Sequence, residues 1–102
     1  MPAAAAVSAP EAGPLPPEAR VEAIRAALSR AFAPSLLEVR DDSHRHVGHA
    51  GARDGRGHFH VTIASAAFAA LSPIARHRAV YAALGSLMQS DIHALSIDAR
   101  AA

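Results

Sequence analysis

The sequence predicts an α+β domain with the element order αββααβ, in which helices cover one face of a three-stranded mixed sheet. Three observations predict this fold class. Apolar residues recur at helical spacing in two segments of the chain. In two other segments they alternate with polar residues, which is typical of half-buried strands. The last apolar run follows a helix, so this third strand can pair in parallel with one strand of a hairpin formed by the first two.

The first element is predicted to be a helix that begins at Pro17. Proline suits the first helical position, and Glu18 follows where the helix dipole favours an acid. One apolar stripe then faces the core, and it consists of Val21, Ile24, Leu28 and Phe32. Pro34 ends the helix.

A β-hairpin with a long connection is predicted next. Leu37 and Val39 point to one face of the first strand, and a polar segment from residue 41 to 57 follows it. In the second strand the alternation is clear over residues 58–63. Phe59, Val61 and Ile63 point inward, whereas His58, His60 and Thr62 point outward.

Two helices and a strand complete the domain. A short helix is expected at residues 65–71, with Phe68 and Leu71 in the core. Ser72 and Pro73 then give an N-cap followed by proline at the first helical position. The apolar stripe of this second helix consists of Ile74, His77, Val80, Tyr81, Leu84, Leu87 and Met88. The run from residue 92 to 97 is the expected last strand.

The chain is expected to form one domain between two short terminal segments. Residues 1–16 are rich in alanine and proline and are interpreted as a disordered leader. The folded domain is placed at 17–99 and a short tail at 100–102. No apolar run approaches the roughly 20 residues that a bilayer crossing needs. The leader has no basic residue, which argues against a secretory or organelle signal, so a cytoplasmic location is expected.

The charge and the missing cysteine exclude several kinds of function. Ten arginines, no lysine and nine acids give a net charge of +1, which is too balanced for a generic coat on nucleic acid or membrane. Without cysteine the chain cannot form a disulfide, supply a thiol nucleophile or build a thiolate metal site by itself.

Histidine is the unusual feature of the composition, because seven occur in 102 residues and five lie between His44 and His60. The polar segment places His44, His46 and His49 among glycines, and neutral imidazole is a good ligand for zinc, copper, nickel and iron. Exposed loop histidines also need no special explanation. The spacing matches neither a helical HExxH motif nor a zinc finger. Solvated residues and metal ligands both stay open for this group.

His93 has a different setting, one residue inside the last strand. It has the parity of Leu95 and Ile97, so its side chain is expected on the core face, half covered at the rim. One interpretation is a core histidine that donates to a backbone carbonyl. The other is a metal ligand paired with a loop histidine. Two imidazoles leave a zinc ion or a two-iron cluster incompletely coordinated, so without cysteine the remaining ligands must come from another molecule.

Arg76, His77 and Arg78 lie in the first two turns of the second helix. Cations there oppose the helix dipole by about a few tenths of a kcal/mol. The group is interpreted either as an indifferent surface or as one that holds an anion or an acidic partner, and His77 is expected to pack in the apolar stripe. Ser43 beside His44 does not make a triad, and no acid pair or activated nucleophile is apparent. The protein is therefore not expected to be an enzyme.

Four blocks of the sequence together resemble the BolA family. They are LEVRDDS at 37–43, HFHV at 58–61, Phe68 with RHRAVY at 76–81, and IHAL at 92–95. The resemblance covers about residues 18–99, and the combination of blocks at these spacings is more specific than any single block. It implies an α+β fold similar to class II KH-like domains, which agrees with the predicted element order.

The resemblance also implies a function. Members of this family are non-enzymatic partners of monothiol glutaredoxins, with which they form heterodimers that share a [2Fe-2S] cluster in iron–sulfur trafficking or iron regulation. The active-site cysteine of the glutaredoxin and its bound glutathione supply the thiolates. The family's ligand at the start of the last strand corresponds to His93, and the loop ligand of its histidine type corresponds to His49. His44 and His46 are alternative loop ligands, and the chain alone is expected to be a monomer.

Two other functions are considered. The rival is a DNA-binding transcriptional regulator that uses the helix with Arg76, His77 and Arg78. The near-neutral charge and the single tyrosine weaken it. The GHAG sequence at 48–51 lies between strands, not between helices as in the KH loop, so it does not support nucleic-acid binding. The third is a mononuclear metal site built from the loop histidines.

Overall fold

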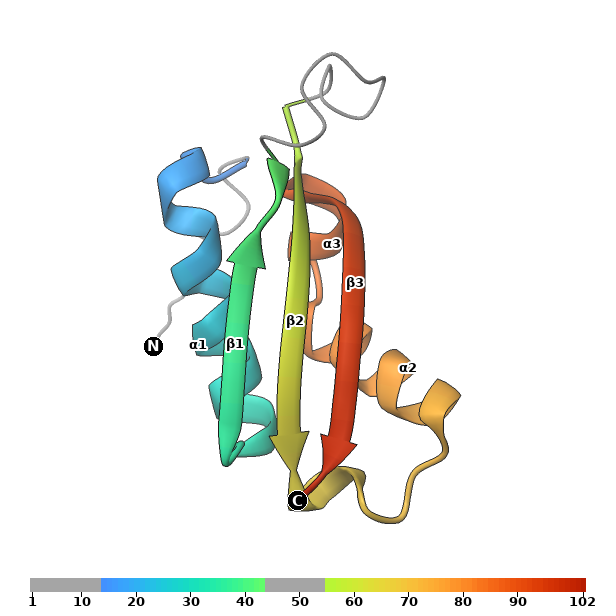
Figure 1. The fold of residues 1–102 in the computed structure, drawn as a ribbon. Helices are drawn as coiled ribbons and strands as arrows, with labels where there is room; N and C mark the ends of the chain where they lie inside the picture. Colours follow the sequence, from blue (N-terminus) through green and yellow to red (C-terminus); the bar gives the residue numbers. More distant parts are fainter. Residues whose placement is uncertain (1–13, 44–54) are drawn as a thin grey trace, which may run out of the picture.

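The computed structural model describes residues 14–43 and 55–102, and its order of helices and strands is αββααβ, as predicted (Figure 1). A turn of 3-10 helix at Pro17–Ala19 leads into the first helix, and a second such turn at Ala66–Phe68 follows the hairpin. The other elements are α1 (Arg20–Phe32), β1 (Leu36–Asp41), β2 (Gly57–Ser65), α2 (Pro73–Leu84), α3 (Leu87–Ser90) and β3 (Ile92–Ala101). The two helices between β2 and β3 differ from the prediction, because the short helix expected at residues 65–71 is only a turn of 3-10 helix and the helix expected after it is divided in two.

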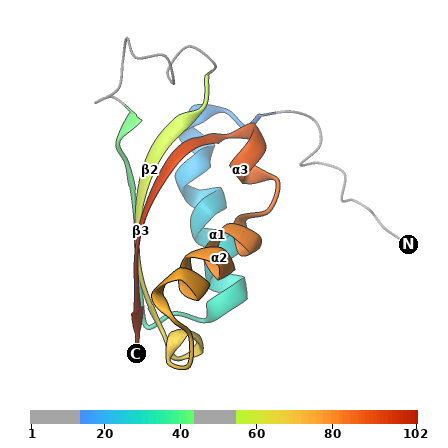
Figure 2. The ribbon, with the colours of Figure 1, turned by 90° about the vertical axis from the view of Figure 1, so that its right-hand side faces the viewer.

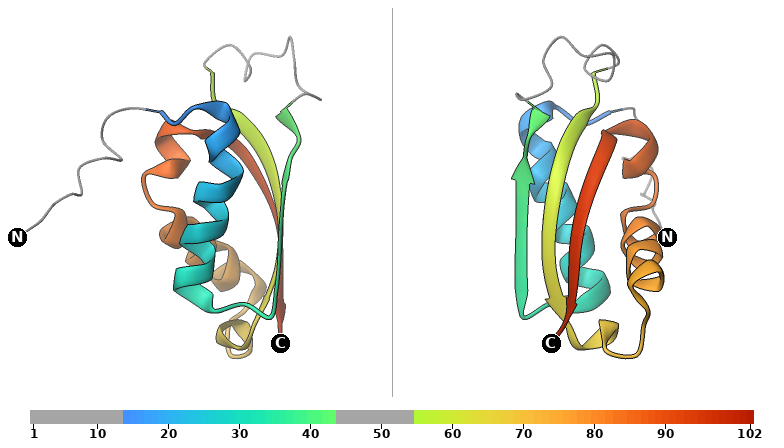
Figure 3. Two further views of the ribbon diagram at one scale, coloured as in Figure 1. Left: turned by 90° about the vertical axis from the view of Figure 1, so that its left-hand side faces the viewer. Right: turned by 45° about the vertical axis from the view of Figure 1, so that its right-hand side comes forward.

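The three strands form one mixed sheet in the order β1–β2–β3. β1 and β2 pair antiparallel, with Val39 opposite Val61, and β3 runs parallel to β2, with Ile97 opposite Val61. The described helices all lie on the same side of the sheet, as the side views in Figures 2 and 3 show. The predicted α+β class is therefore confirmed, and we call the other side of the sheet the helix-free face.

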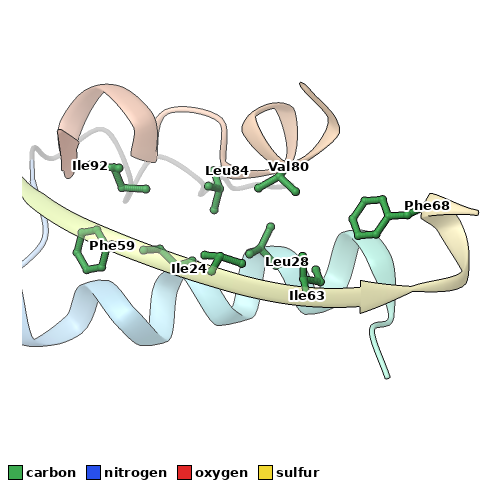
Figure 4. Packing of buried hydrophobic residues seen from close by; sticks show 9 residues of the cluster. Ile24, Leu28, Phe59, Ile63, Phe68, Val80, Leu84 and Ile92 are labelled. Atoms are coloured by element: carbon green, nitrogen blue, oxygen red, sulfur yellow. The ribbon is translucent and has the colours of Figure 1, made fainter. Parts of the chain in front are cut away.

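The core lies between β2 and the helices. Every second residue of β2 from Gly57 to Ser65 is buried, which confirms the predicted alternation. Figure 4 shows these side chains meeting those of α1, α2 and the start of β3. The buried cluster consists of Ile24, Leu28, Phe59, Val61, Ile63, Phe68, Val80, Leu84 and Ile92. Burial of such side chains contributes about 1.5–3 kcal/mol each relative to leaving them exposed.

The helix predicted after Ser72 is correct at its start and wrong in its buried face. The hydroxyl of Ser72 accepts a hydrogen bond from the third residue of α2, as an N-cap should. Ile74 and Tyr81 were expected in the core but are 62% and 41% exposed. His77 is also exposed and does not pack as predicted. Only the face of α2 that carries Val80 and Leu84 is buried against the sheet. The residues on either side of this face therefore point to solvent.

The predicted stripe also continued to Met88, but α2 ends at Leu84. Gly85 has φ 57°, a conformation that glycine adopts without the penalty of a Cβ atom. Its amide donates to the carbonyl of Tyr81 at 3.1 Å, which closes the helix. The chain then turns into α3, and this break directs it back to the beginning of the sheet, where β3 starts.

The last strand is longer than predicted. It was expected to end at Ile97 and to leave a tail at 100–102, but β3 continues to Ala101, which lies opposite Ser65 of β2. The end of β3 therefore lies beside the end of β2, at the bottom of the sheet in Figure 1.

The structure describes the last three residues of the segment that the sequence assigned to a leader. Residues 14–16 are described, and the amide of Leu15 donates to the carboxylate of Asp91 at 2.8 Å. Residues 1–13 lie outside the described part of the chain. Within that described part, no helix has the length and apolar character needed to cross a membrane.

A buried ion pair, which the sequence did not indicate, lies where β2 and β3 begin. Nε of Arg20 donates to Oδ1 of Asp91 at 2.9 Å, and the two side chains are 8% and 2% exposed. Asp91 also accepts the amide of Leu15 and, at 2.6 Å, the hydroxyl of Ser90. Burying two charges costs several kcal/mol per ion unless further hydrogen bonds satisfy them, and here three donors converge on one carboxylate.

The same pair reaches both strands. Nη2 of Arg20 donates to the carbonyl of Gly55 at 2.7 Å, two residues before β2. The amide of Gly57, the first residue of β2, donates to the carbonyl of Asp91 at 2.8 Å. The first residue of α1 therefore holds the beginnings of β2 and β3 side by side.

Replacing Arg20 with methionine keeps much of the aliphatic volume but leaves the Asp91 carboxylate buried without its cation. We expect the free energy of unfolding, measured by urea denaturation at neutral pH, to fall by about 3–5 kcal/mol. Arg30→Met, at an exposed position of the same helix, is the control and should change it by less than about 0.5 kcal/mol. Equal stability of the two variants would contradict the role of the pair.

The ion pair also makes stability depend on acid. Burial raises the pKa of Asp91, but hydrogen bonds from Ser90, Arg20 and Leu15 and the charge of Arg20 outweigh it, so the pKa lies below the ordinary value of an aspartate. The stability that the ion pair contributes is therefore complete above the pKa of Asp91 in the unfolded state. It is lost as the pH falls through the pKa of Asp91 in the folded state. We expect Asp91→Asn to be less stable at pH 7 and to lose less further stability than wild type below about pH 4, as measured by urea unfolding. If the stability of the variant falls as steeply with decreasing pH as that of wild type, other carboxyl groups cause the loss.

Candidate functional site

The end of the sheet that Arg20 and Asp91 hold together also carries two histidines. In β2, Phe59 points into the core, so His58 beside it lies on the helix-free face, as the alternation predicts. His93 is the second residue of β3, whose start lies next to the start of β2.

His93 does not lie on the core face, where the sequence placed it, but is exposed. The register explains the difference, because Gly57 lies opposite Ile92 while His58 lies opposite Ala94. His93 is thus the extra residue of a β-bulge, and the alternation shifts by one position there, so that Ile92 is buried in its place. The sequence offered one signal for this bulge, which is Gly57 at the start of the strand pattern, because a glycine in a strand often marks a bulge.

The bulge brings the ring of His93 beside that of His58. The ring centroids are 5.2 Å apart, and the ring planes make an angle of 38°. With metal–nitrogen bonds of about 2.0–2.1 Å, two imidazoles on one metal ion have centroids roughly 4.5–5.5 Å apart. The pair therefore has a separation suited to two ligands of one metal ion. The sequence pointed to loop histidines as partners of His93, and it missed His58.

Arg56 contacts the same ring. Its Nη2 lies 3.2 Å from Nδ1 of His93, and its Nη1 donates to the carbonyl of Gln89 in α3 at 3.5 Å. A guanidinium has donors only, so Nδ1 of His93 must be the acceptor in this contact. The neutral ring then carries its proton on Nε2. No sequence pattern singled out Arg56.

Neighbouring side chains lie close to the main chain at Gly57, and this close packing sets the position of His58. A Cβ atom at Gly57 would lie 2.7 Å from the ring of Phe59 and 2.7 Å from Oγ of Ser43. This hydroxyl accepts a hydrogen bond from the amide of His58 at 3.0 Å. The amide of Ser43 in turn donates to the carboxylate of Asp41 at 2.8 Å. The end of β1 is therefore bonded to the beginning of β2, next to the histidine.

A hollow in the surface adjoins the histidine pair. It is lined by Asp42, His58, Phe59, Ala94, Leu95 and Ser96. Nε of Arg40 donates to the Asp42 carboxylate at 2.9 Å, so this acid is held at the edge of the hollow. No described helix covers this face of the sheet (Figure 2). The described helices therefore leave the hollow open to a partner.

Farther along, the helix-free face carries charges of both signs. Arg100 donates to Asp98 at 3.2 and 2.7 Å. These hydrogen bonds lower the pKa of Asp98, burial opposes them, and the charges of Arg100 and His60 add to the lowering. The pairing of cations with acids leaves this face without the continuous basic character of a nucleic-acid surface.

The predicted loop ligands His49, His44 and His46 lie outside the described residues, so their place relative to His93 stays a prediction. Among residues 14–43 and 55–102, no group of three or more histidine, aspartate or glutamate side chains could hold a metal ion. The described part of the site therefore offers a pair of imidazoles, which is an incomplete coordination sphere.

Arg76 was assigned to a partner surface, but its guanidinium is used inside the fold. Its Nε donates to the carbonyls of Phe68 and Leu71, both at 3.0 Å. Its Nη1 donates to the carbonyl of Ala99 in β3 at 3.2 Å. Arg76 therefore ties the segment before α2 to the end of the sheet, whereas the adjacent His77 and Arg78 are exposed.

The two predicted surfaces lie at opposite ends of β3. Arg76 contacts the strand at Ala99, six residues after His93, which corresponds to about 20 Å at 3.3 Å per residue. Figure 1 shows the same arrangement, with β3 starting beside α3 and ending near the beginning of α2. A partner bound at one end need not cover the other.

Comparison with known proteins identifies the family. The model of the BolA family, described as BolA-like protein, matches residues 28–102. The chain is 44% identical over 78 residues to human BolA-like protein 1, which is 76% of this chain and 55% of the human protein. It is 40% identical over 76 residues to the DNA-binding transcriptional regulator BolA of Vibrio cholerae, which is 74% of this chain and 69% of that protein. The chain therefore belongs to the BolA-like family.

A solved structure supports the fold in the same way. The BolA domain of SufE1 from Arabidopsis thaliana superposes with a TM-score of 0.71 at 39% identity, over 80% of this chain and 91% of that domain. The class II KH-like arrangement implied by the family resemblance is thus confirmed. The chain spans only about half the length of the human relative. The histidine type of loop stays a prediction, because that loop lies outside the described residues.

Gly57→Ala is expected to disturb the site through packing. The added methyl group meets both Phe59 and Ser43, so we expect the free energy of unfolding to fall by about 1–3 kcal/mol and the ring signals of His58 to shift in NMR spectra. The double variant Ser43→Ala/Gly57→Ala removes one of the two contacts and should lose less stability than the sum of the single variants. A fully stable Gly57→Ala variant with unchanged His58 signals would contradict the close approach.

Proposed function

We propose that this protein is a non-enzymatic adaptor that shares a [2Fe-2S] cluster with a monothiol glutaredoxin, in iron–sulfur cluster trafficking or iron regulation. The observation that carries the proposal is the juxtaposition of His58 and His93, whose ring centroids are 5.2 Å apart at an accessible end of the sheet. Membership of the BolA-like family supports this class of function.

The donor set suits one iron of such a cluster. In Rieske-type centres two histidines bind one iron and cysteine thiolates bind the other. This chain offers imidazoles but has no cysteine. A partner must therefore supply two thiolates, and a monothiol glutaredoxin with bound glutathione offers one from its cysteine and one from the tripeptide. Replacing two thiolates with neutral imidazoles raises the potential of a bound cluster.

The shape of the site favours a heterodimer. His93 is exposed, and the hollow beside His58 opens on the helix-free face. A partner can approach there without displacing a described helix, and the bulge keeps His93 at the rim where two proteins would meet. Each chain then contributes half of the ligands, so neither holds the cluster alone.

We propose His93 as the constant ligand and consider two sources for the second imidazole. His58 is adjacent to it in the structure. His49 is the loop ligand that the family resemblance implies, with His44 and His46 as alternatives. Single alanine variants at these positions separate the two sources, because only loss of the true ligand changes the cluster spectrum.

Co-expression with a monothiol glutaredoxin is expected to yield a coloured heterodimer. His93→Ala should alter its visible absorption and circular dichroism and weaken cluster retention at least about tenfold, since even outer-shell changes cost about 10- to 100-fold. His77→Ala, an exposed histidine on α2, is the matched control and should leave both spectra unchanged. A colourless mixture that fails to co-elute, or a spectrum unaffected by His93→Ala, would contradict the proposal.

DNA binding is the second candidate function, and one observation favours it. The relative from Vibrio cholerae is named a DNA-binding transcriptional regulator, and it matches 74% of this chain. The exposed side chains of His77 and Arg78 on α2 are the candidate surface. A gel shift without glutaredoxin should then weaken with added salt and with Arg78→Ala but not with His93→Ala. No shift at about 50 mM salt would exclude this function.

A further inference from the structure

The guanidinium of Arg56 holds a ring nitrogen of the proposed ligand His93. Nη2 lies 3.2 Å from Nδ1 of His93, and Nη1 bonds the carbonyl of Gln89. The two contacts use different nitrogens of one planar group, so a single side chain bridges α3 and the start of β3. Arg56 is therefore oriented toward the ring from two anchor points.

Metal ligation through either ring nitrogen conflicts with this contact. If Nδ1 binds a metal, its lone pair is no longer available to Arg56. If Nε2 binds, the neutral ring must carry its proton on Nδ1, where it would point at an N–H group of Arg56. The hydrogen bond and the metal–nitrogen bond are mutually exclusive in both cases.

The charge of Arg56 acts in the same direction for a bare metal ion. The guanidinium stays protonated at all relevant pH values. A divalent cation on the neighbouring ring is therefore repelled by it, although solvent screens the repulsion at this exposed position. Loss of a hydrogen bond and like-charge repulsion both lower the affinity of His93 for metal.

We propose, on the basis of the function proposed above, that Arg56 is a positioning residue that opposes ligation by His93 and so favours release of a cluster from this protein. In the metal-free state it holds the ring with its proton on Nε2. Binding of metal breaks this contact, and release restores it. Arg56 thus sets how readily the adaptor gives up its cargo.

The first test reads the tautomer of His93 directly. Long-range proton–nitrogen NMR spectra of the metal-free protein above about pH 8, where a free imidazole is neutral, report which ring nitrogen carries the proton. Wild type should show it on Nε2, and Arg56→Ala should lose this preference. Arg100→Ala, which removes the same charge near the far end of β3, is the control and should match wild type. A wild-type ring with its proton on Nδ1 would overturn the proposal.

The second test measures affinity with Ni²⁺ alone by calorimetry. Arg56→Ala is expected to bind about three- to tenfold more tightly than wild type, which corresponds to the net value of one hydrogen bond. Arg100→Ala should bind as wild type does, which separates the local contact from the loss of net charge.

The outcomes distinguish this proposal from the proposed function. If Arg56→Ala binds no more tightly while His93→Ala loses the metal, then His93 is a ligand and the inference about Arg56 is wrong. If His93→Ala binds Ni²⁺ as wild type does, His93 is not a ligand, and both proposals fail. Because Arg56 is not a member of the buried apolar cluster, thermal unfolding of Arg56→Ala is expected to stay close to that of wild type.

Discussion

The contact between Arg20 and Asp91 is the constraint on which the candidate site depends. Two opposite charges are buried there, and the structure satisfies them with hydrogen bonds from the main chain and from a serine. The cost of removing charge from water makes this arrangement intolerant of partial disruption. It fixes the place where the beginnings of β2 and β3 meet, and the candidate ligands lie within a few residues of that place.

Main-chain hydrogen bonds connect the Arg20–Asp91 pair to the two histidines and so fix where they lie. The carbonyl of Asp91 accepts the amide of Gly57, and the next residue in β2 is His58. On the other strand, the bulge that begins after Ile92 turns His93 out of the core. Neither histidine belongs to the buried apolar cluster, so the geometry of the pair depends on backbone hydrogen bonds, on the small size of Gly57 and on the contact of Arg56 with His93.

Local patterns predicted much of the fold, because the spacing of apolar residues within a short segment indicates whether that segment forms a helix or a strand. The stripe on α1 and the alternation in β2 gave the correct core faces, and the order of elements indicated a mixed sheet without saying which hairpin strand pairs with β3. What failed depends on partners distant in sequence. The bulge at His93 is defined only by its register against β2, and Arg56 lies 37 residues from the ring it contacts. Similarly, a stripe on α2 does not reveal how wide an arc the sheet covers, so Tyr81 was misplaced.

The parallel pairing of β2 with β3 has a consequence for biosynthesis. A parallel neighbour cannot be reached by a tight turn, so the chain must first cross over through α2 and α3. During translation His58 therefore leaves the ribosome well before its counterpart exists, and the two imidazoles meet only once the final strand has docked. Such non-local contacts form late because the entropy of loop closure must be overcome first. A nascent or truncated chain that ends before β3 therefore lacks the juxtaposed pair of His58 and His93, and only the completed domain presents it.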